Sequence, residues 1–190
     1  MNENLAYQDE AWEELIGGRI VAMSPRPTFN HNRVAFNIAY LFERYLRKKK
    51  CTAIADGTDL FLTEDDRFVP DVMIVCDPDK IRNDGVHGAP DLVVEVLSPS
   101  TAKNDRSYKK DVYERCGVRE YWIANPADKT VEQYLLRDGK FSLHEIYAIL
   151  PDWMLAKMKP EEREKVAESF RCSLFDDLVI SLEDIFARIP

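Results

Sequence analysis

The 190-residue sequence has no apolar run that approaches the roughly 20 residues required by a membrane-spanning helix. Its acidic and polar first stretch, 1–15, gives no sign of a secretory signal peptide, and we expect no membrane partner. The 4 cysteines form no Cys-x-x-Cys pair, which favours reduced thiols in a cytoplasmic protein over a disulfide set or a zinc site. Without a GxSxG motif around Ser98 or Ser100, a serine hydrolase of that type is excluded.

Positive charge is scarcer than negative charge: 26 Lys and Arg stand against 34 Asp and Glu, which gives a net charge of −8. This balance argues against a protein that binds polyanions by bulk electrostatics alone. Two local basic patches remain, and each could equally be a solvated helix face. They are the stretch 44–50 and the set Lys103, Arg106, Lys109 and Lys110.

The order of apolar and polar residues predicts alternating helices and strands. We expect a short helix over 10–16, a long helix over 31–49 capped by Asn30, and a helix over 103–116. The expected strands are the segment after the Gly17-Gly18 turn, then 51–56, 58–63, 68–76, 91–98, 118–125, 130–137 and 141–149.

This order predicts an α/β fold in which helices flank a mixed central β-sheet. The run 92–97 is apolar except for Glu95, as expected of a central strand that is covered on both faces. The last two strands should form an edge hairpin, where a homodimer could assemble. We expect one domain over 1–150 and a C-terminal helical appendage over 151–190, with a charged helix over 160–170, packed on the same domain.

Glu95 is the first candidate functional residue. A charged carboxylate inside a dry sheet is costly unless its pKa rises or a salt bridge or a metal ion compensates it. Asp71 lies in another apolar strand, and two acids on adjacent strands repel each other unless a cation lies between them. A hard divalent cation such as Mg²⁺ takes carboxylate oxygens as ligands, so we expect Asp71 and Glu95 to bind one.

Asp91 is a rival partner for Glu95, because the two residues point to the same face of their strand. Four residues at about 3.3 Å each separate them by roughly 13 Å, which is too far to share one ion. Asp71, about 5 Å away on a neighbouring strand, is therefore the better partner.

Three segments closely resemble the Uma-two family, restriction-endonuclease-like proteins of the PD-(D/E)XK nuclease superfamily. They are VPDV at 69–72, VVEVLSPST at 93–101 and DRSYKKDVYERCGVREYWIANP at 105–126. The resemblance runs from about 20 to 139 and continues weakly over 173–186. The superfamily pattern of an Asp followed by an acid-x-Lys matches Asp71 and Glu95, but Leu97 stands where the Lys is expected.

In this family the Lys has moved to the following helix, four residues before a Tyr, and Lys109 and Tyr113 have that spacing. Asp105, Lys109 and Tyr113 share one helix face, so an ordinary ion pair between Lys109 and Asp105 is the alternative. His31 also matches a family position, where it could contact metal-bound water or a phosphate, or be only structural.

The resemblance implies a restriction-endonuclease-like core and a metal-dependent endonuclease that hydrolyses DNA phosphodiester bonds with Mg²⁺ or Mn²⁺. Asp71, Glu95 and the backbone carbonyl of Val96 would hold the metal, and Lys109 and His31 would assist catalysis. The alternative is a catalytically silent module that binds nucleic acid or protein and retains the nuclease fold. The acidic net charge and the displaced Lys motivate this alternative.

Overall fold

The computed structural model describes residues 13–22, 26–55 and 57–190. Within them, strand β9 (Leu92–Val96) lies inside a six-stranded sheet of order β12-β11-β10-β9-β6-β3, and all of β9 is buried. It runs parallel to β10 (Glu120–Asn125) and antiparallel to β6 (Val72–Val75). The expected mixed sheet with a covered central strand is confirmed.

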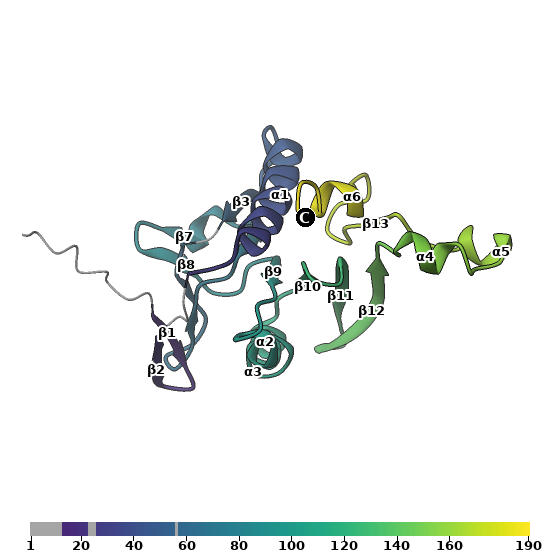
Figure 1. Cartoon of the computed structure of the whole chain (residues 1–190). Coiled ribbons are helices and arrows are strands. Elements are labelled where there is room, and N and C mark those ends of the chain that lie inside the picture. Colours follow the sequence, from purple (N-terminus) through teal and green to yellow (C-terminus); the bar gives the residue numbers. More distant parts are fainter. Residues whose placement is uncertain (1–12, 23–25, 56) are drawn as a thin grey trace, which may run out of the picture.

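Helices cover both faces of this central sheet (Figure 1). On one face, α1 (Phe29–Leu46) packs Ile38 and Phe42 against Trp122 of β10. On the other face, α3 (Tyr108–Cys116) packs Tyr113 against Tyr121. Tyr121 and Trp122 are neighbours in β10 and point to opposite faces of the sheet, so each of them packs in a different core.

Helix α1 begins earlier than its sequence pattern suggested. Its N-cap is Thr28, whose hydroxyl accepts a hydrogen bond from the backbone N–H of His31 at 3.3 Å. Asn30 therefore lies in the first turn, and its expected role as the cap was wrong. Both residue types suit the position, so the sequence could not rank them.

The helix expected over 103–116 is divided at Ser107. Its two parts are α2 (Ala102–Arg106) and α3, and the backbone at Ser107 is not helical, with φ −123° and ψ −94°. Gly117 then ends α3 in a left-handed conformation with φ 88°, which glycine adopts without a steric penalty. The break leaves Asp105 and Lys109 on separate helices that face the same interior.

The remaining described strands of the N-terminal half form a second sheet of order β2-β1-β5-β4-β8-β7. Its strands are β1 (Glu13–Ile16), β2 (Arg19–Ala22), β4 (Leu60–Phe61), β5 (Arg67–Phe68), β7 (Ile81–Arg82) and β8 (Gly85–His87), with the 3₁₀ turn η1 (Pro78–Lys80) before β7. β4 and β5 pair antiparallel around the turn that contains Asp65 and Asp66.

The prediction of a helix over 10–16 is wrong for residues 13–16. Residues 10–12 lie outside the described part, and residues 13–16 form strand β1, which pairs with β2 and β5. Gly17 and Gly18 adopt φ 58° and 74° and turn the chain back on itself. This hairpin pairing outweighs the weak helical pattern of a short acidic segment.

Strands β11 (Thr130–Arg137) and β12 (Lys140–Ala148) form the expected edge hairpin around Asp138-Gly139. The C-terminal elements are α4 (Asp152–Leu155), α5 (Pro160–Arg163), β13 (Ser169–Arg171), β14 (Val179–Ser181) and α6 (Leu182–Ile185). The helix expected over 160–170 is therefore much shorter: it ends at Arg163, and residues 169–170 belong to β13. Figure 1 shows α4 and α5 projecting from the body, whereas β13 and α6 lie against α1 and the central sheet.

Strand β3 (Thr52–Ala55) pairs with β6 at the edge of the central sheet. Its register sets Thr52 opposite Val75, and one further step sets Cys51 opposite Cys76. These two cysteines form a disulfide, and Cys116 and Cys172 are free. The expectation of reduced thiols throughout was wrong for this pair, because the pairing of two strands joins residues far apart in sequence.

None of the helices in the described part of the chain could span a membrane.

Candidate functional site

Asp71 directly precedes β6, whose register sets Val72 opposite Val94 in β9. One further step along both strands sets Asp71 opposite Glu95. Glu95 points toward the face that α3 covers, where Lys109 and Tyr113 contact it, whereas the carboxylate of Asp71 hydrogen-bonds the β9 backbone at the neighbouring Val96. The structure thus brings these two acids together, as the sequence predicted.

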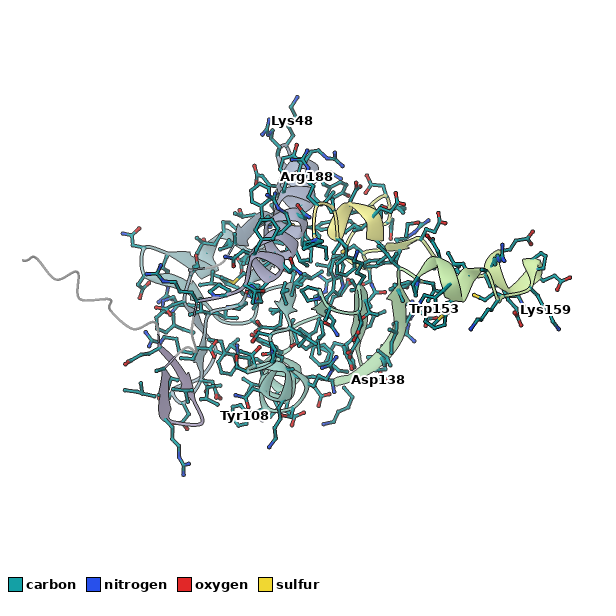
Figure 2. The ribbon with its side chains drawn as sticks, viewed as in Figure 1. Lys48, Tyr108, Asp138, Trp153, Lys159 and Arg188 are labelled. Carbon is teal, nitrogen blue, oxygen red and sulfur yellow. A yellow bond between two sulfur atoms is a disulfide. The ribbon has the colours of Figure 1, made fainter. Side chains whose placement is uncertain are left out.

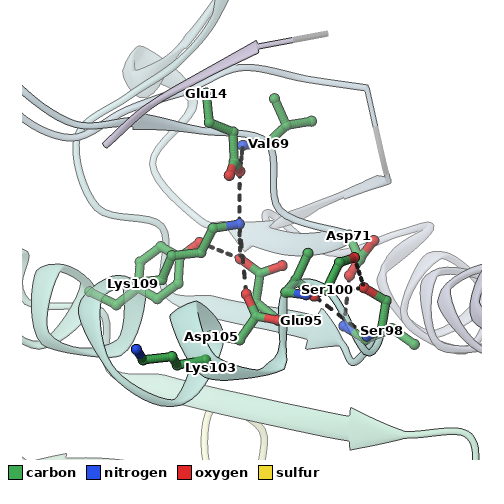
Figure 3. A network of polar contacts seen from close by, with 12 residues as sticks. Glu14, Val69, Asp71, Glu95, Ser98, Ser100, Lys103, Asp105 and Lys109 are labelled. Atoms are coloured by element: carbon green, nitrogen blue, oxygen red, sulfur yellow. Dashed lines mark hydrogen bonds and ion pairs between the residues drawn. The ribbon is translucent and has the colours of Figure 1, made fainter. Parts of the chain in front are cut away.

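Lys109 lies at the centre of a buried ionic cluster (Figure 3). Its Nζ is 2.7 Å from Oε1 of Glu14, 3.3 Å from Oε1 of Glu95 and 3.8 Å from Oδ1 of Asp105. Its side chain is only 5% exposed. The ion pair with Asp105 that the sequence left as the alternative is therefore present, together with contacts to Glu14 and Glu95.

Glu95 is held by a second helical residue. Its Oε1 accepts a hydrogen bond from the Tyr113 hydroxyl at 2.7 Å. Lys109 and Tyr113 lie four residues apart on one face of α3 and therefore reach the same carboxylate oxygen. Burial raises the pKa of Glu95 well above its ordinary value, against the opposing effect of Lys109. Burial also raises the pKa of Tyr113, which keeps that hydroxyl a hydrogen-bond donor.

Asp71 is held by helix α1 and by the backbone of β9. Its Oδ1 is 3.3 Å from Nε2 of His31, and its Oδ2 accepts a hydrogen bond from the backbone N–H of Val96 at 2.6 Å. The side chains of His31 and Asp71 are 13% and 12% exposed, so they are more accessible than the Lys109 cluster. All the residues proposed for the site from the sequence, including His31 and Val96, thus lie in one connected group.

With all of its carboxylates ionised, the cluster holds more negative than positive charge. Of the described side chains, Glu14, Glu95 and Asp105 all approach the single ammonium of Lys109. Burial raises the pKa of Asp105 to about 6, and its Oδ1 is buried without a hydrogen-bond partner. Burial also disfavours the ammonium of Lys109, yet the surrounding carboxylates outweigh this effect and raise its pKa. A site with this charge balance would be stabilised by an added cation.

Glu14 is the residue of this cluster that the sequence did not reveal. Its Oε1 accepts hydrogen bonds from Lys109 and, at 3.0 Å, from the backbone N–H of Val69. It lies on β1, where we expected a helix, and nothing in the local pattern separates it from its exposed neighbour Glu13. Only the pairing of β1 with β5 carries Glu14 to the site.

Several other polar residues have local partners away from the cluster. Asp91 accepts a hydrogen bond from the backbone N–H of Cys76 at 2.8 Å, which holds the entrance of β9. Lys110 lies over the ring of Tyr134 at 4.9 Å, away from the acids. The remaining pairs are Asp59 with Arg67, Asp84 with His87, and Ser98 with Ser100. Asp56 lies outside the described residues.

The donor atoms fit a hard cation by their chemistry, although they are not a complete metal cage. No group of three or more His, Cys, Asp or Glu side chains converges as metal ligands among the residues that the structure describes. The fit depends instead on two opposed carboxylates, Asp71 and Glu95, beside the β9 backbone. Mg²⁺ is commonly held by one or two carboxylates, with water completing its shell.

A mixed sheet between helices, with two acids opposed on adjacent strands, gives this molecule the mixed α/β fold of a restriction-endonuclease-like protein. The chain belongs to the Uma2 family, described as "Putative restriction endonuclease", whose model matches residues 2–158. The resemblance seen in the sequence is therefore confirmed.

Two curated relatives come from the cyanobacterium Synechocystis sp. The uncharacterized protein sll1609 is 28% identical over 138 residues, which cover 70% of this chain and 77% of that protein. The uncharacterized protein slr1290 is 25% identical over 165 residues, which cover 85% and 80%. Among solved structures, a "putative nuclease belonging to DUF820" from Anabaena variabilis matches with a TM-score of 0.68 and 20% identity. That match covers 93% of this chain and 90% of the other, and it supports the fold.

Proposed function

We propose that this protein is a metal-dependent endonuclease that hydrolyses DNA phosphodiester bonds. The carrying observation is the pair Asp71 and Glu95, which lie one residue beyond the last residue pair of the β6–β9 ladder, with Asp71 hydrogen-bonded to Val96 and Glu95 in the ionic cluster of Lys109. Membership of a family described as restriction endonucleases supports the same class of reaction.

Asp71, Glu95 and the carbonyl of Val96 would hold Mg²⁺ or Mn²⁺. A divalent cation in this position would activate water and stabilise negative charge on the scissile phosphate. His31 would orient Asp71, whose Oδ1 it already contacts. Because Lys109 binds Oε1 of Glu95, it would orient this carboxylate and offer its ammonium to a phosphate oxygen or to the attacking water.

Cleavage of supercoiled plasmid DNA tests the proposal. Wild-type protein should nick the plasmid with Mg²⁺ or Mn²⁺ and should be inactive with EDTA. Asp71→Asn and Glu95→Gln should each lower the rate by at least ~100-fold, because each replaces a carboxylate that would hold the metal ion. The matched control is Asp138→Asn, a similar change at the exposed tip of the β11–β12 hairpin, which should cleave at the wild-type rate.

Circular dichroism and thermal melting should show that the inactive variants remain folded. Cleavage that continues unchanged in Glu95→Gln would contradict the assigned mechanism. A wild-type protein that is folded, binds no Mn²⁺ in titration calorimetry and cleaves no nucleic acid would instead support a silent binding module.

A further inference from the structure

The outward face of α1 carries a line of aromatic rings and guanidinium groups that the proposed chemistry does not use. We name it the α1 ladder; it consists of Phe29, Arg33, Phe36, Tyr40 and Arg44. These residues recur every three or four positions, so they form one stripe along the helix. The buried residues of α1, such as Ile38 and Phe42, lie on the opposite side.

Consecutive members of the α1 ladder touch one another. The Arg33 guanidinium lies 5.7 Å from the Phe29 ring centre and 5.6 Å from that of Phe36. Phe36 and Tyr40 are stacked at 6.3 Å with an angle of 8° between their planes. The guanidinium of Arg44 continues the line at 6.0 Å from the Tyr40 ring. Cation–π contacts thus hold the rings in place on the surface.

The rings of the ladder remain open to solvent. Phe29, Phe36 and Tyr40 are 61%, 60% and 55% exposed. A shallow hollow lined by Phe29, Asn32, Arg33 and Phe36 lies at one end of the stripe. Exposed rings on a single helix face, away from the core, are typical of surfaces that bind another molecule.

The charge on and beyond α1 favours an anionic partner. The helix contains a single acidic residue, Glu43. Its basic residues and those that follow it are Arg33, Arg44, Arg47, Lys48, Lys49 and Lys50, and Figure 2 shows Lys48 projecting at the far end of α1. This local excess of positive charge contrasts with the net charge of −8 for the whole chain.

The Phe29 end of the α1 ladder lies at the same helix end as the candidate site, on the opposite side of α1. His31, which contacts Asp71, lies in the first turn of α1, two residues after Phe29. From Phe29 to Arg44 the stripe extends for about 22 Å, at 1.5 Å per residue. A polymer held on the stripe would therefore run from the basic end of α1 to its first turn and would have to pass around that turn to reach the candidate metal site.

We propose that the α1 ladder binds a single-stranded segment of DNA beside the cleavage site. Bases would stack on Phe29, Phe36 and Tyr40, while Arg33 and Arg44 would contact phosphates. A duplex does not fit this role, because its base faces already stack on one another and only unpaired bases can stack on protein rings. The inference rests on the proposed nuclease function and adds the form of the substrate.

Fluorescence anisotropy with a labelled single strand tests this inference in EDTA, where cleavage cannot occur. Wild-type protein should bind the single strand more tightly than a duplex of the same sequence. Phe36→Ala and Tyr40→Ala should each weaken single-strand binding by about tenfold. The matched control is Trp153→Ala, which removes a ring that is 61% exposed on α4 and should leave binding unchanged.

The outcomes separate this inference from the proposed function. Plasmid cleavage with no selective loss of single-strand binding in Phe36→Ala would overturn the ladder proposal and leave the nuclease intact. Selective loss of binding, in a protein that cleaves neither the plasmid nor the single strand with Mg²⁺ or Mn²⁺, would support the ladder and contradict the nuclease. If sedimentation shows a wild-type dimer that Phe36→Ala converts to a monomer, the stripe is an interface between copies and the proposal is overturned.

Discussion

The single ammonium of Lys109 neutralises only part of the charge of Glu14, Glu95 and Asp105. Replacing one partner of a buried ion pair leaves an uncompensated charge and costs roughly 3–5 kcal/mol. Lys109→Ala would therefore lower stability as well as activity. For this reason Asp71 and Glu95 are better positions than Lys109 for a test of chemistry.

The raised pKa of Asp105 predicts a stability that falls as the pH rises. Between its ordinary pKa of 3.8 and its folded pKa of about 6, the folded protein holds this proton more tightly than the unfolded chain does. The free energy of unfolding therefore decreases with increasing pH in that window, by about 3 kcal/mol for this group. Asp105→Asn should remove this part of the pH dependence.

Urea unfolding at a series of pH values between about 4 and 7 measures this effect. The curve for Asp105→Asn should be flatter than that of the wild type, whereas the exposed control Asp138→Asn should follow the wild type. A wild-type protein that becomes more stable than Asp105→Asn as the pH rises from 4 to 7 would contradict the inferred burial of the carboxyl group.

At the scale of elements, long regular patterns were predictable from the sequence and local pairings were not. The apolar spacing of α1, the unbroken buried run of β9 and the Asp138-Gly139 turn of the hairpin are each signals within one segment. Strand β1 and the break at Ser107 depend on contacts with other segments. A four-residue strand carries too few residues for its own period to be read.

The disulfide between β3 and β6 illustrates the same limit and gives a prediction at this scale. It closes a loop with a sequence separation of 25 residues, so its loss should lower the free energy of unfolding by roughly 3 kcal/mol. The double variant Cys51→Ser with Cys76→Ser should melt at a lower temperature than the wild type.

Thiol titration of the denatured protein should detect two free cysteines before reduction and four afterwards, since Cys116 and Cys172 are unpaired. The control Cys116→Ser, at a free and partly exposed cysteine, should melt close to the wild type. Four reactive thiols before reduction would contradict the disulfide.

At the scale of the whole molecule, the site is assembled from segments that are distant in sequence. β1 contributes Glu14, α1 contributes His31, the β6 and β9 strands contribute Asp71 and Glu95, and α3 contributes Lys109. The sequence alone identified the last four, because an acid in an apolar strand is conspicuous and the family resemblance located Lys109 and His31. Glu14 has no such signal, since only the packing of the second sheet against α3 gives it a partner.

The C-terminal segment packs against the central sheet. Phe170 packs edge-on against Trp122 at 4.9 Å, and the carboxylate of Glu120 accepts hydrogen bonds from Trp122, Gln133 and Ser173. These contacts join the end of the chain to the central sheet on the face opposite the ionic cluster. They therefore stabilise β9 and β10 on the face of the sheet opposite Glu95 and Lys109.

The central claim is that Asp71 and Glu95 jointly ligate one cation. Diffraction from crystals soaked in Mn²⁺, collected where manganese scatters anomalously, tests this claim most directly. The account predicts one anomalous peak in contact with both carboxylates in the wild type and no peak there in Glu95→Gln. A peak elsewhere, or an ordered Asp71 and Glu95 with no manganese between them, would contradict it.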